Sequence, residues 1–151
     1  MCYPLIFKLE GKKILFIGAG EVSLRKVKAI LSFSKPDITV ISKDFNSEFF
    51  MLPVKLIKKE AEPSDISKEY DFVFICTDDK NLNRALTLKA KELSIPVNVA
   101  NDRKACDFYT PAVIRFEDVI ISISTQGKNP SRSKEFKEKL LKALKCIDFE
   151  C

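Results

Sequence analysis

The sequence contains no histidine, and its five cysteines form no C-x-x-C pair. Without histidine, a zinc site would need cysteine or carboxylate ligands, and no spacing suggests one, so we predict no bound metal. The same absence excludes Ser-His and Cys-His nucleophile pairs, which leaves Asp, Glu, Lys, Tyr or Cys as the base of any reaction. An odd number of scattered cysteines favours reduced thiols over a disulfide framework.

Long apolar runs are also missing. No stretch reaches the roughly 18–20 apolar residues that span a membrane, and the first residues lack the basic and apolar regions of a signal peptide. We therefore expect a cytoplasmic protein with no membrane partner. The net charge of +5 suits a polyanionic partner, either a carboxylate-rich small molecule or a nucleic acid. No zinc-finger spacing or aromatic-interleaved basic run accompanies the charge, so we expect no nucleic acid.

The most informative stretch is an apolar run, 14–17, followed by Gly18-Ala19-Gly20 and then by a helical pattern. This order is how a Rossmann domain opens its dinucleotide site. Gly18 would let the chain turn tightly out of the strand, and Gly20 would let the backbone approach a pyrophosphate at the helix start. The third position of the G-x-G-x-x-G pattern is Ser23, so the fingerprint is incomplete.

Further strands and helices alternate along the 151 residues, as expected for one domain with a small appendage. We predict a short edge strand at Leu5–Leu9 and a helix start capped by Asp78 or Asp79. Apolar runs predict strands at 38–41, 54–57, 72–76 and 95–99, and helices with apolar stripes at 24–31 and 82–93.

Ligands of an open α/β sheet lie outside the carboxyl ends of its strands. Thr77 occupies such an end, and the Ser42-Lys43-Asp44 segment follows the second strand, where a Rossmann site contacts the adenosine ribose. Asp44 comes late for a contact to the 2′-hydroxyl and Lys43 would tolerate a 2′-phosphate, so this loop leaves NAD and NADP open.

The loop after the strand at 95–99 borders the same crevice. Asp102 or Asp107 is a candidate general base there, although turn-forming Asn-Asp chemistry alone explains the pair Asn101-Asp102. Beyond it, strand-like runs at 112–114 and 119–124 precede a helix capped by Asn129-Pro130. A hairpin and one helix bury little by themselves, so we expect them to pack on the Rossmann body or on a second copy, in a homodimer.

These motifs, in this order and spacing, resemble precorrin-2 dehydrogenase, the NAD-dependent module of sirohaem synthases. The resemblance runs from about Tyr3 to Leu144. The segments that carry it are Pro4–Phe7, Gly18–Val22 with Arg25-Lys26, Thr77–Asp79 with Asn83, Asn98-Val99, Cys106–Phe108 with Pro111, and Ser124-Thr125 with Gly127 and Pro130.

The resemblance implies an α/β fold, a Rossmann-like parallel sheet with a small C-terminal β-hairpin-plus-helix dimerisation region. Residues 1–111 would be the NAD-binding domain and 112–151 the dimerisation region of a homodimer. It implies oxidation of precorrin-2 to sirohydrochlorin with NAD⁺ as hydride acceptor, a carboxylate-fringed tetrapyrrole that suits a basic protein. The cofactor contacts implied, which favour NAD over NADP, are Glu21, Val22, Lys43, Asp44 and Thr77, beside Gly18, Gly20 and Ser42.

On the substrate side, the family places small hydroxyl residues, here Ser124 and Thr125, close to the tetrapyrrole. Arg132 and Lys134, at the start of the last helix, are candidate carboxylate clamps, with a solvated helix face as the alternative.

The chain departs from the family where the catalytic aspartate is expected, because Asn101 stands there. Asparagine takes no proton at neutral pH, so Asn101 would orient substrate while Asp102, one residue on, becomes the candidate carboxylate. A second activity as a chelatase is disfavoured, since no histidine is available to accept the pyrrole protons. Two non-catalytic alternatives stay open: a nucleotide-sensing Rossmann module, and a tetrapyrrole carrier that feeds a separate chelatase.

Overall fold

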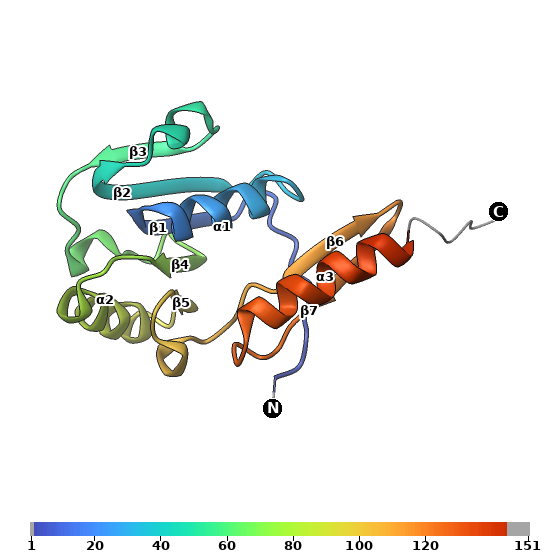
Figure 1. Ribbon diagram of the computed structural model, residues 1–151. Helices are drawn as coiled ribbons and strands as arrows, with labels where there is room; N and C mark the ends of the chain where they lie inside the picture. Colours follow the sequence, from blue (N-terminus) through green and yellow to red (C-terminus); the bar gives the residue numbers. More distant parts are fainter. Residues whose placement is uncertain (1, 145–151) are drawn as a thin grey trace. The chain divides into compact units, whose positions relative to one another are not determined.

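The computed structural model describes residues 2–144. It divides into two compact units: Leu5–Phe108, and a second unit that combines the start of the chain, up to Pro4, with the chain from Tyr109 onward (Figure 1). Residues 145–151 of the predicted dimerisation region lie outside the described residues. In the part of the chain that is described, no helix has both the length and the apolar character to cross a membrane.

The larger unit contains a five-stranded, fully parallel sheet in the order β3-β2-β1-β4-β5. This order is that of the Rossmann fold, with the strand order reversing between β1 and β4, and the predicted fold class is confirmed. The strands are β1 (Lys13–Ala19), β2 (Asp37–Phe45), β3 (Lys55–Lys58), β4 (Phe72–Ile75) and β5 (Val97–Val99).

Both faces of this sheet are buried, which explains the unbroken apolar run in β1. Leu15 and Ile17 face a core that includes residues of α2 (Lys80–Glu92), whereas Ile14 and Phe16 face a core closed by α1 (Glu21–Leu31). The rings of Phe16 and Phe74 stack with their centroids 4.3 Å apart. Full burial of each such side chain contributes roughly 1.5–3 kcal/mol.

Two sequence predictions about the larger unit are wrong. Leu5–Leu9 forms no strand, because it packs its side chains on the larger unit instead of pairing with an edge of the sheet: Phe7 contacts the ring of Phe72 edge-on, and Leu9 packs against the core that α1 closes. The second strand does not end at Ile41: β2 continues to Phe45, because Ser42 pairs with β3 and Phe45 pairs with Ala19 after an irregularity in β1.

The smaller unit is a hairpin with one helix. Strands β6 (Ala112–Phe116) and β7 (Val119–Ile123) are antiparallel, and Phe116 faces Val119 across a two-residue turn. Helix α3 (Pro130–Leu144) contacts both strands. Among the described residues of this unit, the buried apolar side chains are Ile114 in β6 and Leu144 in α3. The division of roles between 1–111 and 112–151 stays a prediction.

Candidate cofactor and substrate sites

The first glycine of the turn is required by the fold itself. Gly18 has a φ of +95°, and a Cβ atom built there would lie 2.6 Å from the backbone oxygen of Cys76. This close approach brings the end of β1 against the end of β4, where the amide of Cys76 donates to the oxygen of Ile17 at 2.7 Å. Gly18 therefore shapes the crevice at the point where the strand order reverses.

The second glycine leaves the start of α1 open. Gly20 is the N-cap residue of α1, no side chain caps the helix there, and a Cβ built on it would meet nothing within 4 Å. An N-terminus with free N–H groups and a positive dipole end is suited to a pyrophosphate. Ser23, at the third position of the fingerprint, is fully buried, which demands a small residue where helix and sheet pack. These features fit a bound dinucleotide.

Glu21 and Val22 follow this turn as the first residues of α1, and both are exposed. A carboxylate oxygen of Glu21 accepts a hydrogen bond from the side-chain amide of Asn46, which follows β2. The side-chain oxygen of Asn46 also accepts from the amide of Glu48. Asn46 thus ties the start of α1 to the segment after β2, and sequence reasoning missed it because the strand was ended too early.

The segment Ser42–Asp44 is part of β2 rather than a loop, and its two charged side chains have partners. Lys43 forms an ion pair with Glu60 at 2.7 Å, and Asp44 lies 3.6 Å from the ammonium of Lys58. The hydrogen bond to Glu60 is the main reason that the pKa of Lys43 is raised. Glu60 was not predicted, since only the β2–β3 register brings it beside Lys43.

Thr77 follows β4, and its hydroxyl donates to the side-chain oxygen of Asn83 in α2. Asn83 is buried and returns a hydrogen bond to the backbone oxygen of Thr77 at 2.9 Å. Of the two predicted N-cap residues, Asp78 and Asp79, Asp79 caps α2, and its carboxylate accepts from the amides of Asn81 and Leu82. This arrangement fixes the chain after β4, so the oxygen atoms of Thr77 are held in place at the crevice.

The loop after β5 carries two carboxylates, Asp102 and Asp107, and each accepts from backbone amides through one oxygen. Asp102 caps a short 3₁₀ helix: its Oδ1 accepts from the amides of Lys104 (3.0 Å) and Ala105 (3.3 Å). None of the described residues donates a hydrogen bond to its Oδ2. Asp107 accepts instead from the amide of Val97 at 3.0 Å, at the start of β5.

Cys106 fastens this loop to β5. Its thiol lies 3.2 Å from the amide and the oxygen of Val99, and 3.2 Å from the oxygen of Asp102. Burial raises the pKa of the Cys106 thiol, and it raises that of Cys76 to about 11. Both thiols are therefore neutral near pH 7 and poor nucleophiles.

Burial likewise lowers the pKa of Lys26, whose ammonium lies 5.7 Å from the ring centroid of Phe74. Lys26 lies in α1 and belongs to the Arg25-Lys26 pair of the sequence motif. Among the described residues, no three His, Cys, Asp or Glu side chains come together in a way that could hold a metal ion.

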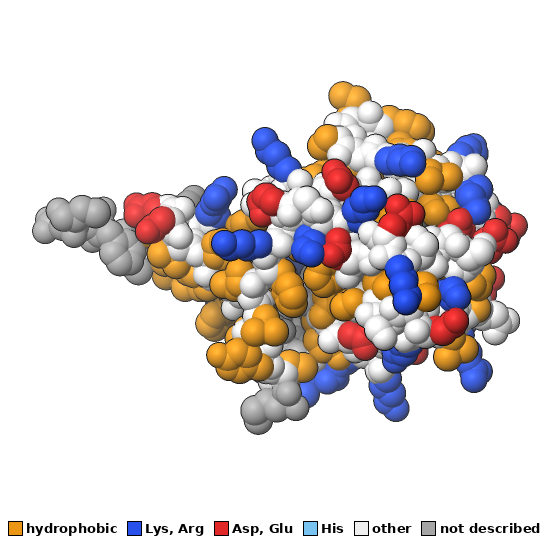
Figure 2. Space-filling model, turned by 180° about the vertical axis from the view of Figure 1, so that it is seen from behind, with side chains coloured by type: hydrophobic (Ala, Val, Ile, Leu, Met, Phe, Trp, Pro, Cys, Tyr) orange, Lys and Arg blue, Asp and Glu red, His pale blue; other side chains and the backbone are white. Residues whose placement is uncertain are grey.

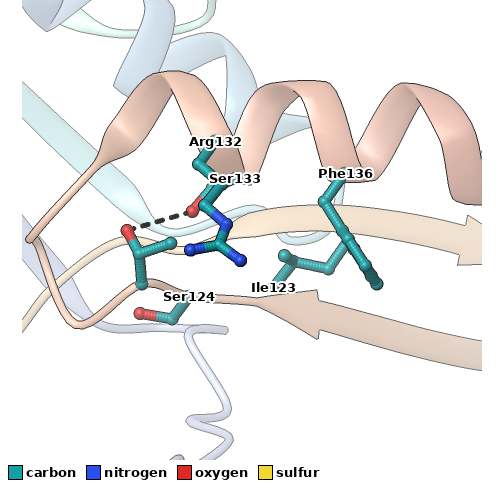
Figure 3. Close-up of a pocket in the computed structure, with 6 residues that line it drawn as sticks. Ile123, Ser124, Arg132, Ser133 and Phe136 are labelled. Atoms are coloured by element: carbon teal, nitrogen blue, oxygen red, sulfur yellow. Dashed lines mark hydrogen bonds between the residues drawn. The ribbon is translucent and has the colours of Figure 1, made fainter.

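In the smaller unit, three of the four predicted substrate residues line one cavity of about 210 Å³. Figure 3 shows the guanidinium of Arg132 reaching from α3 toward Ser124, which directly follows β7. The hydroxyl of Thr125 takes part in the turn itself, because it accepts from the amide of Asn129 and donates to the oxygen of Asn129. The cavity is lined by Ile123, Ser124, Thr125, Arg132, Ser133 and Phe136.

Lys134 does not line this cavity and is exposed on α3. On the face of the molecule shown in Figure 2, basic and acidic side chains are interspersed, with hydrophobic side chains between them. The cation that the smaller unit places beside hydroxyl groups is therefore Arg132, whose planar guanidinium suits a carboxylate.

Comparison with known proteins identifies the larger unit. A family model described as "Putative NAD(P)-binding" matches residues 5–112. The chain is similar to a siroheme synthase of Psychrobacter arcticus (37% identity over 132 residues, 85% of this chain and 24% of the relative). It is also similar to a precorrin-2 dehydrogenase of Bacillus subtilis (29% identity over 145 residues, 93% of this chain and 88% of the relative).

A solved structure of a precorrin-2 dehydrogenase, SirC, superimposes with a TM-score of 0.80 at 23% identity, over 94% of this chain and 71% of that one. This likeness confirms the fold. The chain spans about a quarter of the length of the siroheme synthase and most of the length of the Bacillus protein. The resemblance predicted from the sequence is confirmed.

Proposed function

The chain belongs to the NAD(P)-binding family whose model matches residues 5–112, and we propose that it oxidises precorrin-2 to sirohydrochlorin with NAD⁺ as hydride acceptor. The observation that carries the proposal is its similarity to the Bacillus subtilis precorrin-2 dehydrogenase over 88% of that protein's length. The open N-terminus of α1 beside a glycine turn and the Arg132 cavity support the two binding tasks this reaction needs.

The bound dinucleotide would supply the hydride acceptor, and the protein would supply binding, orientation and a proton acceptor. Gly18 and Gly20 would hold the pyrophosphate at the start of α1, beside Glu21 and Val22. Ser42, Lys43 and Asp44 would lie along the adenosine side, and Thr77 would contact the cofactor from the end of β4. The reaction releases one proton for each hydride transferred, so a base is required.

We assign that base to Asp102. Its Oδ1 is held by two backbone amides, which fixes the carboxylate, and its Oδ2 is not occupied by any described residue. A general base works best when its geometry is fixed and one lone pair is available. Asn101, next to it and exposed, would orient a polar group of the substrate through its amide.

The substrate carries acetate and propionate groups, and Arg132 would bind one of them together with the hydroxyl of Ser124. The Ser124 hydroxyl accepts from the amide of Gln126 at 3.0 Å and still has its own proton to donate. Thr125 would act by holding the turn, and Lys134 would add long-range attraction for the carboxylates.

We further propose a cytoplasmic homodimer. Val119 and Ile120 in β7 and Phe136 in α3 are about half exposed, so the hairpin and helix carry apolar surface that a second copy would cover. The cytoplasm is where the nicotinamide cofactor is available. A separate chelatase would then insert the metal into the product.

The decisive experiment supplies the purified chain with precorrin-2 and NAD⁺ and follows NADH and the sirohydrochlorin spectrum. We expect stoichiometric formation of both. Binding of both ligands without turnover would overturn the enzyme assignment and favour a carrier or sensor instead.

The base is tested with Asp102→Asn, because an asparagine oxygen still caps the 3₁₀ helix but takes no proton. We expect kcat to fall by roughly 10²-fold or more, the usual size of a general-base effect, with the melting temperature nearly unchanged. Asp107→Asn is the matched control, since it removes the other carboxylate of this loop while an asparagine oxygen can still accept from the amide of Val97, and it should not reduce kcat. Full activity of Asp102→Asn would remove the base assignment and leave the rest intact.

A further inference from the structure

The geometry points to Glu60 as the residue that makes this chain prefer NAD over NADP. The inference rests on the nucleotide site of the proposed function and adds to it a residue that selects between two cofactors. The cofactors differ only at the adenosine 2′ position, which carries a hydroxyl in NAD and a phosphate in NADP. In Rossmann sites, an acidic residue near the second strand accepts from the hydroxyl, and a basic residue accommodates the phosphate.

Lys43 is the basic side chain near the end of the second strand, and Glu60 forms an ion pair with it. The two side chains form an ion pair with 2.7 Å between Nζ and Oε1, although both are largely exposed. The pairing follows from the sheet register: Ser42 pairs with Lys58, and the amide of Lys59 donates to the oxygen of Ser42 at 3.0 Å. The chain after β3 therefore continues alongside the end of β2, and this backbone path places Glu60 next to Lys43.

The surrounding charges add to the effect of Glu60. Asp44 and Lys58 form a second, looser pair at 3.6 Å. Asp79, at the start of α2, acts on Lys43 in the same direction as Glu60, since both carboxylates raise the pKa of the lysine. Lys43 and Lys58 are thus accompanied by three carboxylates, those of Glu60, Asp44 and Asp79.

This balance suits a 2′-hydroxyl and opposes a 2′-phosphate. A hydroxyl can donate to the carboxylate of Glu60, which has a second oxygen beyond the one that binds Lys43. A phosphate with a charge near −2 would have to displace Glu60 from Lys43 and then remain beside it. Lys43 alone would favour the phosphate, so the preference depends on its partner rather than on the lysine.

The test measures binding rather than turnover. Isothermal titration calorimetry with NAD, NADP, 5′-AMP and adenosine 2′,5′-bisphosphate gives the affinity ratio of each phosphorylated and unphosphorylated pair. In Glu60→Gln, we expect that ratio to shift toward the 2′-phosphorylated ligand by roughly five- to tenfold at low salt, for one charge removed some 7 Å from a doubly charged group in water. The shift should shrink as salt is added.

Glu69→Gln is the matched control. It removes the same charge from an exposed ion pair, with Lys13 at 3.4 Å, at the opposite end of β1. We expect no change in the ratio. The double variant Lys43→Gln/Glu60→Gln should lose the gain, because the phosphate then has no lysine to pair with.

An unchanged ratio in a folded Glu60→Gln variant overturns the inference, as does the same gain in the Glu69→Gln control. A wild-type chain that binds neither nucleotide overturns it together with the nucleotide site. The expected shift in a chain that fails to oxidise precorrin-2 supports the inference and refutes the proposed function alone.

Discussion

Changing each glycine of the turn to alanine should affect a different property, stability for Gly18 and NAD affinity for Gly20. Gly18→Ala places a Cβ 2.6 Å from the backbone oxygen of Cys76, in a residue with a φ of +95°. The left-handed conformation costs about 1–2 kcal/mol for a residue with a Cβ. Relieving the clash also loosens the 2.7 Å hydrogen bond from Cys76 to Ile17, at about 0.5–1.5 kcal/mol. Together these two effects should lower the free energy of unfolding by about 1.5–3.5 kcal/mol.

Gly20→Ala should leave the fold almost unchanged, because the added Cβ meets nothing within 4 Å and the φ of Gly20 is −84°. Alanine is a poorer N-cap than glycine by a few tenths of a kcal/mol to about 1 kcal/mol, and the stiffer unfolded chain offsets about 0.4–1 kcal/mol. The new methyl group lies where a pyrophosphate would approach the backbone, so NAD affinity should fall by about tenfold or more, or about 1.4 kcal/mol.

Urea unfolding and calorimetric titration with NAD on both variants separate these effects. Gly18→Ala should lower the midpoint of unfolding, and Gly20→Ala should lower the affinity at an unchanged midpoint. The reasoning would be refuted by a Gly18→Ala variant within 1 kcal/mol of the parent, or by a Gly20→Ala variant that binds NAD normally.

Three further predictions use other parts of the chain. Asp102→Ala removes the cap of the 3₁₀ helix and should cost about 1 kcal/mol in urea unfolding, whereas Asp102→Asn should cost clearly less. Burial raises the pKa of the Cys76 thiol from 9.0 to about 11, so the folded state binds this proton more tightly than the unfolded state does. The free energy of unfolding should therefore fall by about 2–3 kcal/mol as the pH rises from below 9 to 11. The same pH series on Cys76→Ala should lack that component, and an identical slope would contradict it. Ile120→Lys should convert the proposed dimer to a monomer in analytical ultracentrifugation, while a parent chain that sediments as a monomer would contradict the dimer.

The Rossmann architecture could be predicted from local patterns because it is encoded locally. The unbroken apolar run of β1, the glycine turn and the stripe of α1 each determine their own element, and their order determines the sheet. The errors came from pairing, which is not local. Leu5–Leu9 alternates like a strand but packs through Phe7 and Leu9 without pairing, and β2 runs past Ile41 because β3 continues to pair with it.

The site was predictable at the level of segments and less so at the level of atoms. Thr77, the glycines and the loop with Asp102 all lie at the carboxyl ends of strands, as the fold class requires. Glu60 and Asn46 could not be found from the sequence, because they reach their partners through register and through an unexpected strand extension. Lys134 stays a predicted carboxylate clamp, but it does not line the cavity that Arg132 shares with Ser124 and Thr125.

What separates functional from structural candidates at these strand ends is how much of the fold depends on each carboxylate, since all three accept from backbone amides through one oxygen. Asp79, Asp102 and Asp107 are all carboxylates in the predicted crevice loops, and each accepts from backbone amides. Asp79 accepts hydrogen bonds from the first turn of α2, and Asp107 accepts one from the start of β5. Removing either carboxylate would therefore mainly destabilise the fold. Asp102 caps only a three-residue 3₁₀ helix, so less of the fold depends on its carboxylate. A base must be held rigidly and must also take up a proton without destabilising the fold. Among these three carboxylates Asp102 best meets both conditions, which supports the proposal that it serves as the base beside Asn101.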